Sequence, residues 1–430
     1  MVCLAPWFAA TAAPAQDSAA IQFVGLSPSL SFGILHAPAF DLTPTVGGGS
    51  TRLSQDGVEF GLDAEIRLGE STFLEWNGSL FSYSGSRNIS STTPTSGAFT
   101  ITSGTLPTGT ITVDVTPATA PAQAYIQIIT TAPPLNPADV GETKTTNSSP
   151  ETPAGNYISH KDFSLTAGGF MADVLVLLGD KLTAAGYGLI SDQGGFIITG
   201  FGGPGWTTVN TVLRDTTDGS DQMLMLGHTV QLGQGWLLTP QIGVDAQHIS
   251  RSIFQGATYN LGSNLPVTEI LPAVSFSQTE QLRSDYLALM GGLGFSRPIG
   301  QGWTLSNSLD VGRGWMSGSY HSQSDISVVG FGDQSVVGAS QHYSAQPWIG
   351  RVTIGASRSL TPNTTVTFGL FCSYLSAVPT VVTTSVSAPP SASSSTTTST
   401  TAANQVAYTR GVITRPQYSV GLSVNLVYRF

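Results

Sequence analysis

Charged residues are scarce in this chain of 430 residues. They make up only 10% of it, less than half the usual share in soluble globular proteins, and the formal net charge is −10. Lysine occurs only three times, so the chain lacks the basic surface that nucleic-acid binding requires. The two cysteines, Cys3 and Cys372, form neither a disulfide framework nor a zinc motif. These absences argue against ordinary soluble domains and against a nucleic-acid-binding protein.

Long apolar segments are also missing. A helical membrane protein would show about 20 consecutive apolar residues for each span. The longest apolar runs here, such as 174–178, are only a few residues long. Yet 40% of the chain is hydrophobic, which is too much for a disordered protein. An apolar-leaning chain with few charges and no long apolar run is typical of a membrane β-barrel, whose strands hide their hydrophobicity in alternation.

The last thirteen residues carry the clearest alternation. Every second residue from Tyr418 to Phe430 is apolar or aromatic, and the residues between are mainly small or polar. Side chains alternate between the faces of a strand, so one face of this segment is apolar. With Tyr428 and Phe430 as an assembly signal, the segment resembles the C-terminal strand of bacterial outer-membrane β-barrels, the porin-like superfamily. The resemblance implies insertion by the barrel-assembly machinery and contact with outer-membrane lipid and lipopolysaccharide.

The N-terminal residues predict export. Residues 2–13 are mostly apolar, and Ala13-Pro14-Ala15 offers a small-x-small cleavage site. We therefore expect residues 1–15 to be a signal peptide, truncated because it lacks a basic start, and residues 16–430 to be a single barrel domain.

Strands are predicted from the same alternation. The clearest pair is 56–68 and 72–84, joined by the tight turn 69–71, with apolar residues on one face and acidic residues on the other. We expect an antiparallel up-and-down barrel of about 12 strands, with about 10 or 14 as alternatives. The proposed strands are near 22–36, 56–68, 72–84, 159–178, 182–191, 220–232, 236–250, 283–297, 303–318, 343–359, 364–377 and 411–430.

Short turns alternate with long segments rich in Ser, Thr, Gly and Pro. The long segments lie roughly over 37–55, 86–158, 192–219, 253–282, 321–340 and 378–408. This asymmetry predicts short periplasmic turns and long extracellular loops, of which 86–158 and 378–408 are the main insertions. Aromatic residues near the strand ends predict interfacial girdles. These are Phe73, Trp236 and Trp303 at one rim, and Trp315 and Trp348 at the other.

The predicted lumen is acidic. The turn at 69–71 places Glu65 opposite Glu75, and like charges across a strand pair are destabilising unless something compensates them. Water, a proton, a cation or an arginine would do so. The candidate pore-lining residues are Glu59, Asp63, Glu65, Arg67, Glu75 and Arg351.

Three functional classes remain open. Fixed charges inside a pore set ion preference, so the first is a porin-like channel for small solutes or ions with a mild cation preference. The second is a plugged structural or adhesive barrel that displays its extracellular loops. The third is an outer-membrane enzyme, for which the sequence offers neither a G-x-S-x-G nor an H-E-x-x-H motif. We therefore expect no enzyme, no catalytic residue, no metal and no cofactor.

Overall fold

The computed structural model describes residues 22–43, 49–104, 109–114, 123–130, 142–147, 157–164, 170–177, 184–192, 195–262, 273–328, 332–387, 399–401 and 406–429. The expected signal peptide and Phe430 lie outside these residues. No described helix is long and apolar enough to cross a membrane.

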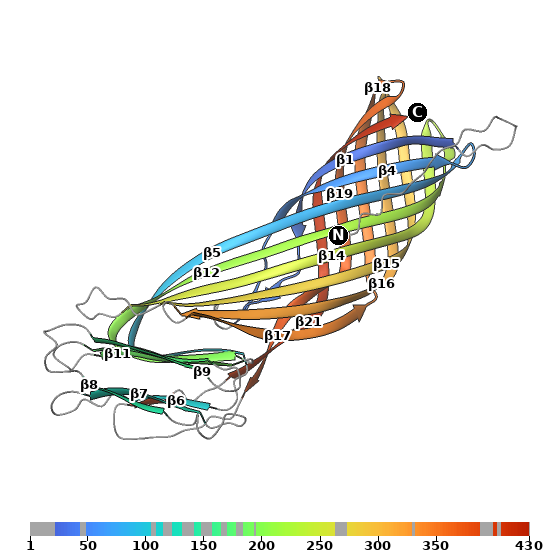
Figure 1. Cartoon of the computed structure of the whole chain (residues 1–430). Helices are drawn as coiled ribbons and strands as arrows, with labels where there is room; N and C mark the ends of the chain where they lie inside the picture. Colours follow the sequence, from blue (N-terminus) through green and yellow to red (C-terminus); the bar gives the residue numbers. More distant parts are fainter. Residues whose placement is uncertain are drawn as a thin grey trace.

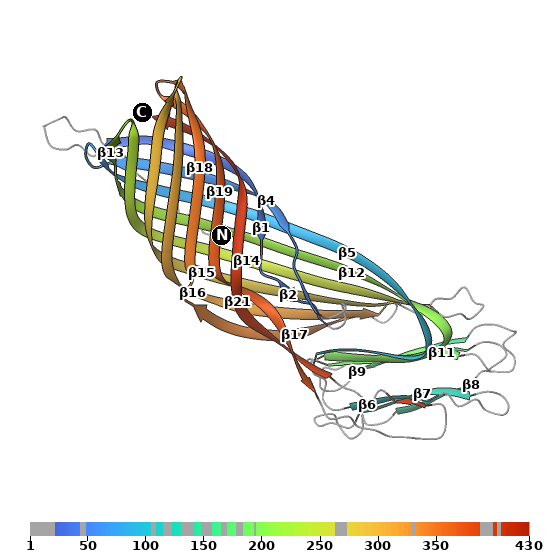
Figure 2. The ribbon, with the colours of Figure 1, turned by 180° about the vertical axis from the view of Figure 1, so that it is seen from behind.

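Antiparallel strands form a closed ring (Figures 1 and 2). Within the described residues the ring has ten members, each paired with the next and the last with the first. In ring order they are β1 (Gln22–His36), β4 (Gln55–Arg67), β5 (Thr72–Gly104), β12 (Gly195–His228), β14 (Trp236–Gly262), β15 (Val274–Gly300), β16 (Trp303–Val328), β18 (Trp348–Thr361), β19 (Thr364–Ser387) and β21 (Val406–Arg429). The predicted antiparallel barrel is confirmed.

The described ring has ten strands, which is the lower of the two alternatives to the expected twelve. Ten of the proposed strands lie in the wall, but 159–178 and 182–191 do not. They fall on β9 (Tyr157–Ser164), β10 (Phe170–Leu177) and β11 (Ala184–Asp192), which extend the sheet from the distal part of β12. The physical reason is that β5 and β12 pair along their whole length, from Thr72↔His228 to Gly104↔Gly195, and so close the wall without them.

Tight turns join the strands at one end of the barrel. Two of these turns have the same sequence, Gly-Gln-Gly, at 233–235 and 300–302. All their residues adopt positive φ, including Gln234 at 49° and Gln301 at 53°. Glycine adopts this left-handed conformation without steric cost, which explains why it flanks the glutamine. Trp236 and Trp303 follow directly, so the turns fix both tryptophans at this rim.

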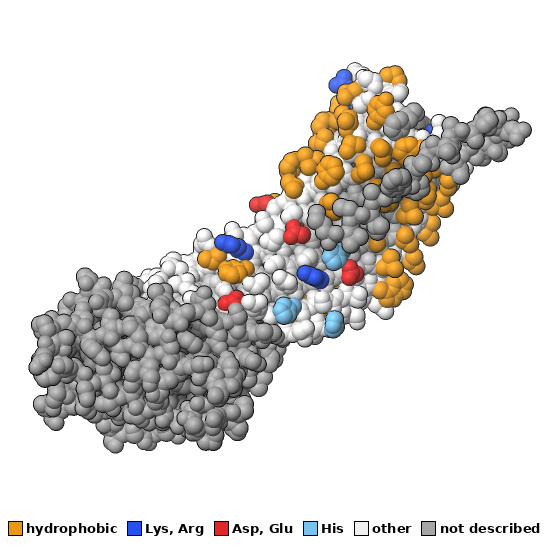
Figure 3. Space-filling model, in the orientation of Figure 1, with side chains coloured by type: hydrophobic (Ala, Val, Ile, Leu, Met, Phe, Trp, Pro, Cys, Tyr) orange, Lys and Arg blue, Asp and Glu red, His pale blue; other side chains and the backbone are white. Residues whose placement is uncertain are grey.

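An apolar belt surrounds the barrel next to these turns, since exposed apolar side chains lie on all ten strands of the ring. Figure 3 shows the belt on one face of the molecule. Outward leucines in it are widely exposed, for example Leu289 and Leu422 at 61% each. The belt ends near Trp315, which pairs across the strands with Leu287. Just beyond Leu287 lies the outward ion pair of His248 with Asp285 (2.7 Å). Exposed apolar side chains in a closed band require lipid around them. The chain is therefore an integral barrel of the bacterial outer membrane, with its short turns on the periplasmic side.

The strands continue far beyond this belt. About 9–11 tilted residues cross a bilayer, but β5 has 33 residues and β12 has 34. The expectation that 86–158, 192–219, 253–282, 321–340 and 378–408 are loops is thus wrong in part, because strands occupy much of these segments. Outside the membrane, neither face of a strand contacts lipid. Strands rich in Ser and Thr therefore lack the apolar alternation by which a strand is recognised in the sequence.

Smaller elements complete the extracellular part. The strand β17 (Gly332–Ala345) pairs with the distal half of β16, directly before β18 in the chain. The short strand β13 (Val230–Gly233) follows β12 and pairs with β14. A separate sheet contains β20 (Ser399–Thr401), β6 (Gly109–Asp114), β7 (Gln123–Thr130) and β8 (Glu142–Asn147). In Figure 1 it lies at the end of the molecule that is remote from the short turns.

Candidate functional site: a lumen closed at two levels

The periplasmic half of the lumen is a polar cavity of about 520 Å³. Strand register determines which side chains reach it. The pairing of β4 with β5 places Glu65 opposite Glu75 and Asp63 opposite Asn77, as the sequence predicted. The lining extends to Phe73 and Ser296, which lie near the β4–β5 and β15–β16 turns. Small side chains such as Ser29 and Ser308 leave the space between the walls.

Four of the six pore-lining candidates line this cavity. They are Glu59, Asp63, Glu75 and Arg351. The other two, Glu65 and Arg67, lie towards the periplasmic rim and form an ion pair with each other (3.4 Å), with side chains 40% and 51% exposed. Glu65 thus gains a positive neighbour, whereas Glu75 accepts a hydrogen bond from Asn77 Nδ2 (2.8 Å). Of the cross-strand pair of acids, Glu65 therefore has a counter-charge and Glu75 has only a hydrogen bond.

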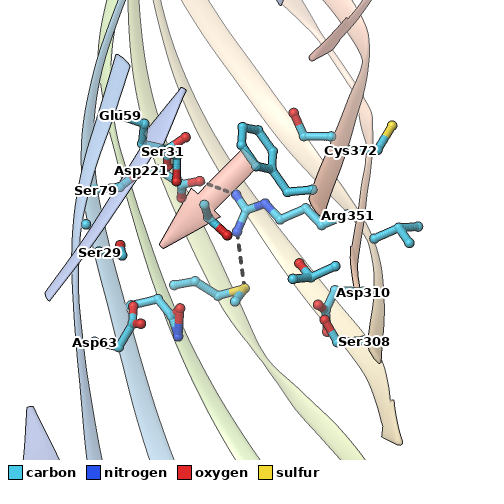
Figure 4. Close-up of a pocket in the computed structure, with 18 of the residues that line it drawn as sticks. Ser29, Ser31, Glu59, Asp63, Ser79, Asp221, Ser308, Asp310, Arg351 and Cys372 are labelled. Carbon is cyan, nitrogen blue, oxygen red and sulfur yellow. Dashed lines mark hydrogen bonds and ion pairs between the residues drawn. The ribbon is translucent and has the colours of Figure 1, made fainter. Parts of the chain in front are cut away.

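Arg351 crosses the lumen from β18 to the facing wall (Figure 4). Its guanidinium donates to Asp221 on β12 and to Asp245 on β14, the latter at 3.0 Å, and it also contacts Met223 Sδ at 3.3 Å. Asp245 is fully buried. A carboxylate in this position requires a counter-charge, and Arg351 supplies it. The arginine therefore connects opposite walls at the upper part of the cavity.

An apolar layer fills the lumen beside this arginine. Its buried members come from β12, β14, β15, β16, β18 and β19, and Phe81 of β5 packs against them. They are Met223, Met225, Ile249, Tyr286, Ala288, Met290, Met316, Ile349, Leu375 and Val378. Met225 is 1% exposed and Met290 is 2% exposed, so water has little access to this layer. This layer is the first constriction of the lumen, on the side of β12 to β19. The polar cavity continues past it to Leu35 and Gln417.

The segment 37–43 closes the lumen on the extracellular side. It follows β1 and contains β2 (Phe40–Asp41), which pairs with β3 (Ser50–Thr51). Ala37 and Phe40 are fully buried, and Thr43 is 2% exposed. Side chains of β14, β19 and β21 hydrogen-bond to its backbone, so the segment lies inside the mouth of the barrel. We call residues 37–43 the plug.

Arg251 holds the plug from β14. It makes a bidentate pair with Asp215 of β12, with distances of 2.9 and 2.7 Å, and both side chains are almost completely buried. The same guanidinium donates to the carbonyl of Pro38 (2.7 Å) and lies over the ring of Phe40, 5.8 Å from its centroid. A fixed, planar donor set of this kind suits arginine and not lysine.

Arg410 of β21 forms a second buried pair, with Glu280 of β15. Both distances are 2.8 Å, and Arg410 also donates to the carbonyl of Asp41 (3.0 Å). Tyr320 donates its hydroxyl hydrogen to Glu280 (3.1 Å). Burial and the neighbouring carboxylate raise the pKa of Tyr320, which keeps it a donor. Gln255 completes the network, because its Oε1 accepts from the backbone N–H of Thr43 (2.9 Å).

The aromatic girdle agrees with the sequence at four of its five positions. Trp236 and Trp303 stand at the turn end, with Arg297 and Arg358 over their rings at 5.2 and 5.6 Å. Trp315 and Trp348 point outward at the other rim, 58% and 51% exposed. Phe73 is the exception and lines the lumen. It has the same strand parity as Glu75, so an inward Glu75 requires an inward Phe73. Tyr428 is exposed on the outer face.

Sequence reasoning missed the residues that close the lumen. Asp215, Arg251, Glu280 and Arg410 all lie in or next to segments that the sequence assigned to long loops. One signal could have found them. Isolated charged residues such as Arg251 stand at alternate positions, two residues after an inward residue such as Ile249. Because these segments were not assigned to strands, the sequence did not reveal that the charged side chains point into the lumen. In the part of the chain that the structure describes, no His, Cys, Asp and Glu side chains group as a metal ion would need.

Comparison with known proteins gives only distant likenesses. No family model matches the chain, and no curated protein is similar to it at a significant level. Among solved structures, the outer membrane protease OmpT from Escherichia coli has a TM-score of 0.34 and 11% identity, over 96% of this chain and 99% of that chain. The P. putida toluene transporter TodX has a TM-score of 0.16 and 7% identity, over 94% and 90%. A Pseudomonas aeruginosa FadL homologue has a TM-score of 0.17 and 8% identity, over 95% and 90%. Likeness at this level carries no argument about activity.

Proposed function

We propose that this protein is a plugged outer-membrane barrel that anchors an extracellular β-structure at the cell surface, a structural and non-enzymatic role. The observation that carries the proposal is the plug at 37–43, which is buried inside the mouth of the barrel and held there by Arg251 and Arg410. An apolar layer that contains Met225 and Met290 narrows the lumen below it. A constitutive porin needs a continuous aqueous path, which this arrangement does not offer.

The length of the strands supports the anchoring role. Only the part of each strand near the short turns carries the outward apolar belt, and the lipids of the outer membrane cover that part. The remaining length of β5, β12, β14, β15 and β16 continues as a paired wall outside the membrane. A wall with a closed interior provides a rigid stalk for the sheets at its far end.

Surface labelling and permeability test the proposal together. In intact cells, a cysteine introduced at Ser317, two residues beyond Trp315 on the same outward face, should react with a membrane-impermeant maleimide. A cysteine at Leu289 should not react, because lipid covers this position. In proteoliposomes, the protein should not increase the uptake of small sugars. Rapid swelling with folded wild-type protein would argue against a closed anchor.

A second candidate is a gated channel for small solutes or ions. The acidic cavity of about 520 Å³ favours it, since such a volume has no structural need. Opening would require displacement of the plug. Conductance of the wild type and of a variant with residues 37–43 replaced by a Gly-Ser linker separates the candidates. A gated channel should show openings in the wild type and steady conductance in the variant, whereas the anchor should show no openings in the wild type.

A further inference from the structure

The periplasmic cavity has an unbalanced charge. Its lining contains five carboxyl groups, on Glu59, Asp63, Glu75, Asp221 and Asp310, but only one guanidinium, that of Arg351. Arg351 is already engaged by Asp221 and by the buried Asp245. Four of the five lining acids therefore have no ion-pair partner among the described residues.

Buried acceptors point to the same need. Gln417 lines the cavity and is 7% exposed, and its Oε1 atom has no hydrogen-bond partner. Asn425 lines the cavity too, with a buried and unpartnered Oδ1 atom. Both atoms only accept hydrogen bonds, and a buried acceptor without a donor is costly. These two acceptors have no donor within the protein, and a ligand with N–H groups would supply one.

The spacing of the acids selects the kind of cation. Asp63 and Asp310 stand on opposite walls, on β4 and β16 (Figure 4). In the described part of the chain, no group of acidic or His side chains converges closely enough to hold a metal ion. A metal ion needs several oxygen atoms around one point. An elongated cation with an ammonium group at each end can instead reach carboxylates that stand apart.

We propose that this cavity binds a small aliphatic diamine that enters from the periplasm. Its two ammonium groups pair with the lining acids Asp63, Glu75 and Asp310, and Asn425, on the same side of the lumen as Asp63, accepts a hydrogen bond. The lining reaches Phe73 and Ser296 near the periplasmic turns, below the plug. Binding there requires no opening of the plug, so the inference is independent of the anchoring role.

Isothermal titration calorimetry on the full-length chain folded in detergent tests the inference. The probes are 1,4-diaminobutane, the uncharged 1,4-butanediol and Mg²⁺ at matched ionic strength. The diamine should bind, and the diol should bind at least about tenfold more weakly because it lacks charge-assisted contacts. The double variant Asp63→Asn/Glu75→Gln should weaken diamine binding at least about tenfold, and Asn425→Leu about two- to tenfold.

The matched control is Asp56→Asn/Asp285→Asn, which also removes two acids but from exposed positions. It should leave the affinity unchanged. Circular dichroism confirms the β-fold of each variant, and Asp310→Asn replaces the double variant if that variant does not fold. The inference is wrong if the diamine does not bind at millimolar concentration, if Mg²⁺ competes as well as the diamine, or if the control weakens binding as much as the lumen variant.

Discussion

Arg251 offers the most direct structural test of the plug. Its side chain is 2% exposed and forms a bidentate pair with Asp215, which is 1% exposed. The change Arg251→Leu leaves the Asp215 carboxylate buried without a counter-charge, which costs about 3–5 kcal/mol. It also leaves the Pro38 carbonyl without its donor, a penalty of about 1–3 kcal/mol. These contributions share one side chain and are not additive, so we expect a loss of at least about 3 kcal/mol.

Two measurements report the effect of Arg251→Leu. Urea unfolding of the protein in phospholipid vesicles gives the free energy of unfolding. Ala37 is fully buried in the plug, so Ala37→Cys reports on its position. This cysteine should be protected from a membrane-impermeant maleimide when Arg251 is present and should react when Arg251 is replaced by leucine, because the plug then loses its main anchor on β14.

The double variant Arg251→Leu/Asp215→Leu is the control. Replacement of both members of a buried ion pair by apolar residues is often neutral, so most of the lost stability should return. The plug still lacks the bond to Pro38, and the cysteine should therefore remain more reactive than in the wild type. Equal stability of the wild type and the single variant, together with unchanged protection of the cysteine, would refute this account of the plug.

Three further predictions concern the belt, the periplasmic rim and the apolar layer. Leu293→Arg should cost about 2–4 kcal/mol in vesicle-based unfolding, because Leu293 pairs with Leu309, midway between Trp303 and Trp315 in the belt. Ser317→Arg beyond the belt should cost less than about 1 kcal/mol; equal costs would mean that the membrane does not surround the belt. Glu65→Gln should stabilise the barrel by about 0.2–1 kcal/mol in the same assay, because it removes a like charge opposite Glu75. A loss of stability would mean that the ion pair of Glu65 with Arg67 stabilises the barrel by more than the repulsion from Glu75 destabilises it. Met225→Ala should cost about 2–5 kcal/mol, since it opens a cavity in the closed layer; a cost below about 1 kcal/mol would indicate that this layer is loosely packed.

The membrane part of the fold could be predicted from the sequence because lipid imposes a pattern. In the wall, every second residue must be apolar, and this alternation in segments such as 56–68 and 418–428 revealed both the strands and the inward acids. The register of Glu65 opposite Glu75 followed from the length of the turn alone. The Gly-Gln-Gly turns and the tryptophans after them were equally visible.

The extracellular part could not be predicted in the same way. Beyond the belt, strands such as the distal half of β5 meet water on their outer face, so serine and threonine satisfy both faces and erase the alternation. The closure of the ring depends on the pairing of β5 with β12, whose partners are 91 to 156 residues apart in the sequence. The plug depends on contacts between Pro38 and Arg251, which no local pattern encodes.

Planar-bilayer conductance of the folded wild-type protein tests the central claim, the closed lumen, most directly. We predict no steady conductance in 1 M KCl, with brief openings at most, because the plug at 37–43 blocks the path and the apolar layer around Met225 narrows it. The variant that lacks the plug, recorded under the same conditions, shows how much of the closure is due to the plug. A steady, ohmic conductance of the wild-type protein, present in every insertion event, would contradict the claim and identify the barrel as an open pore.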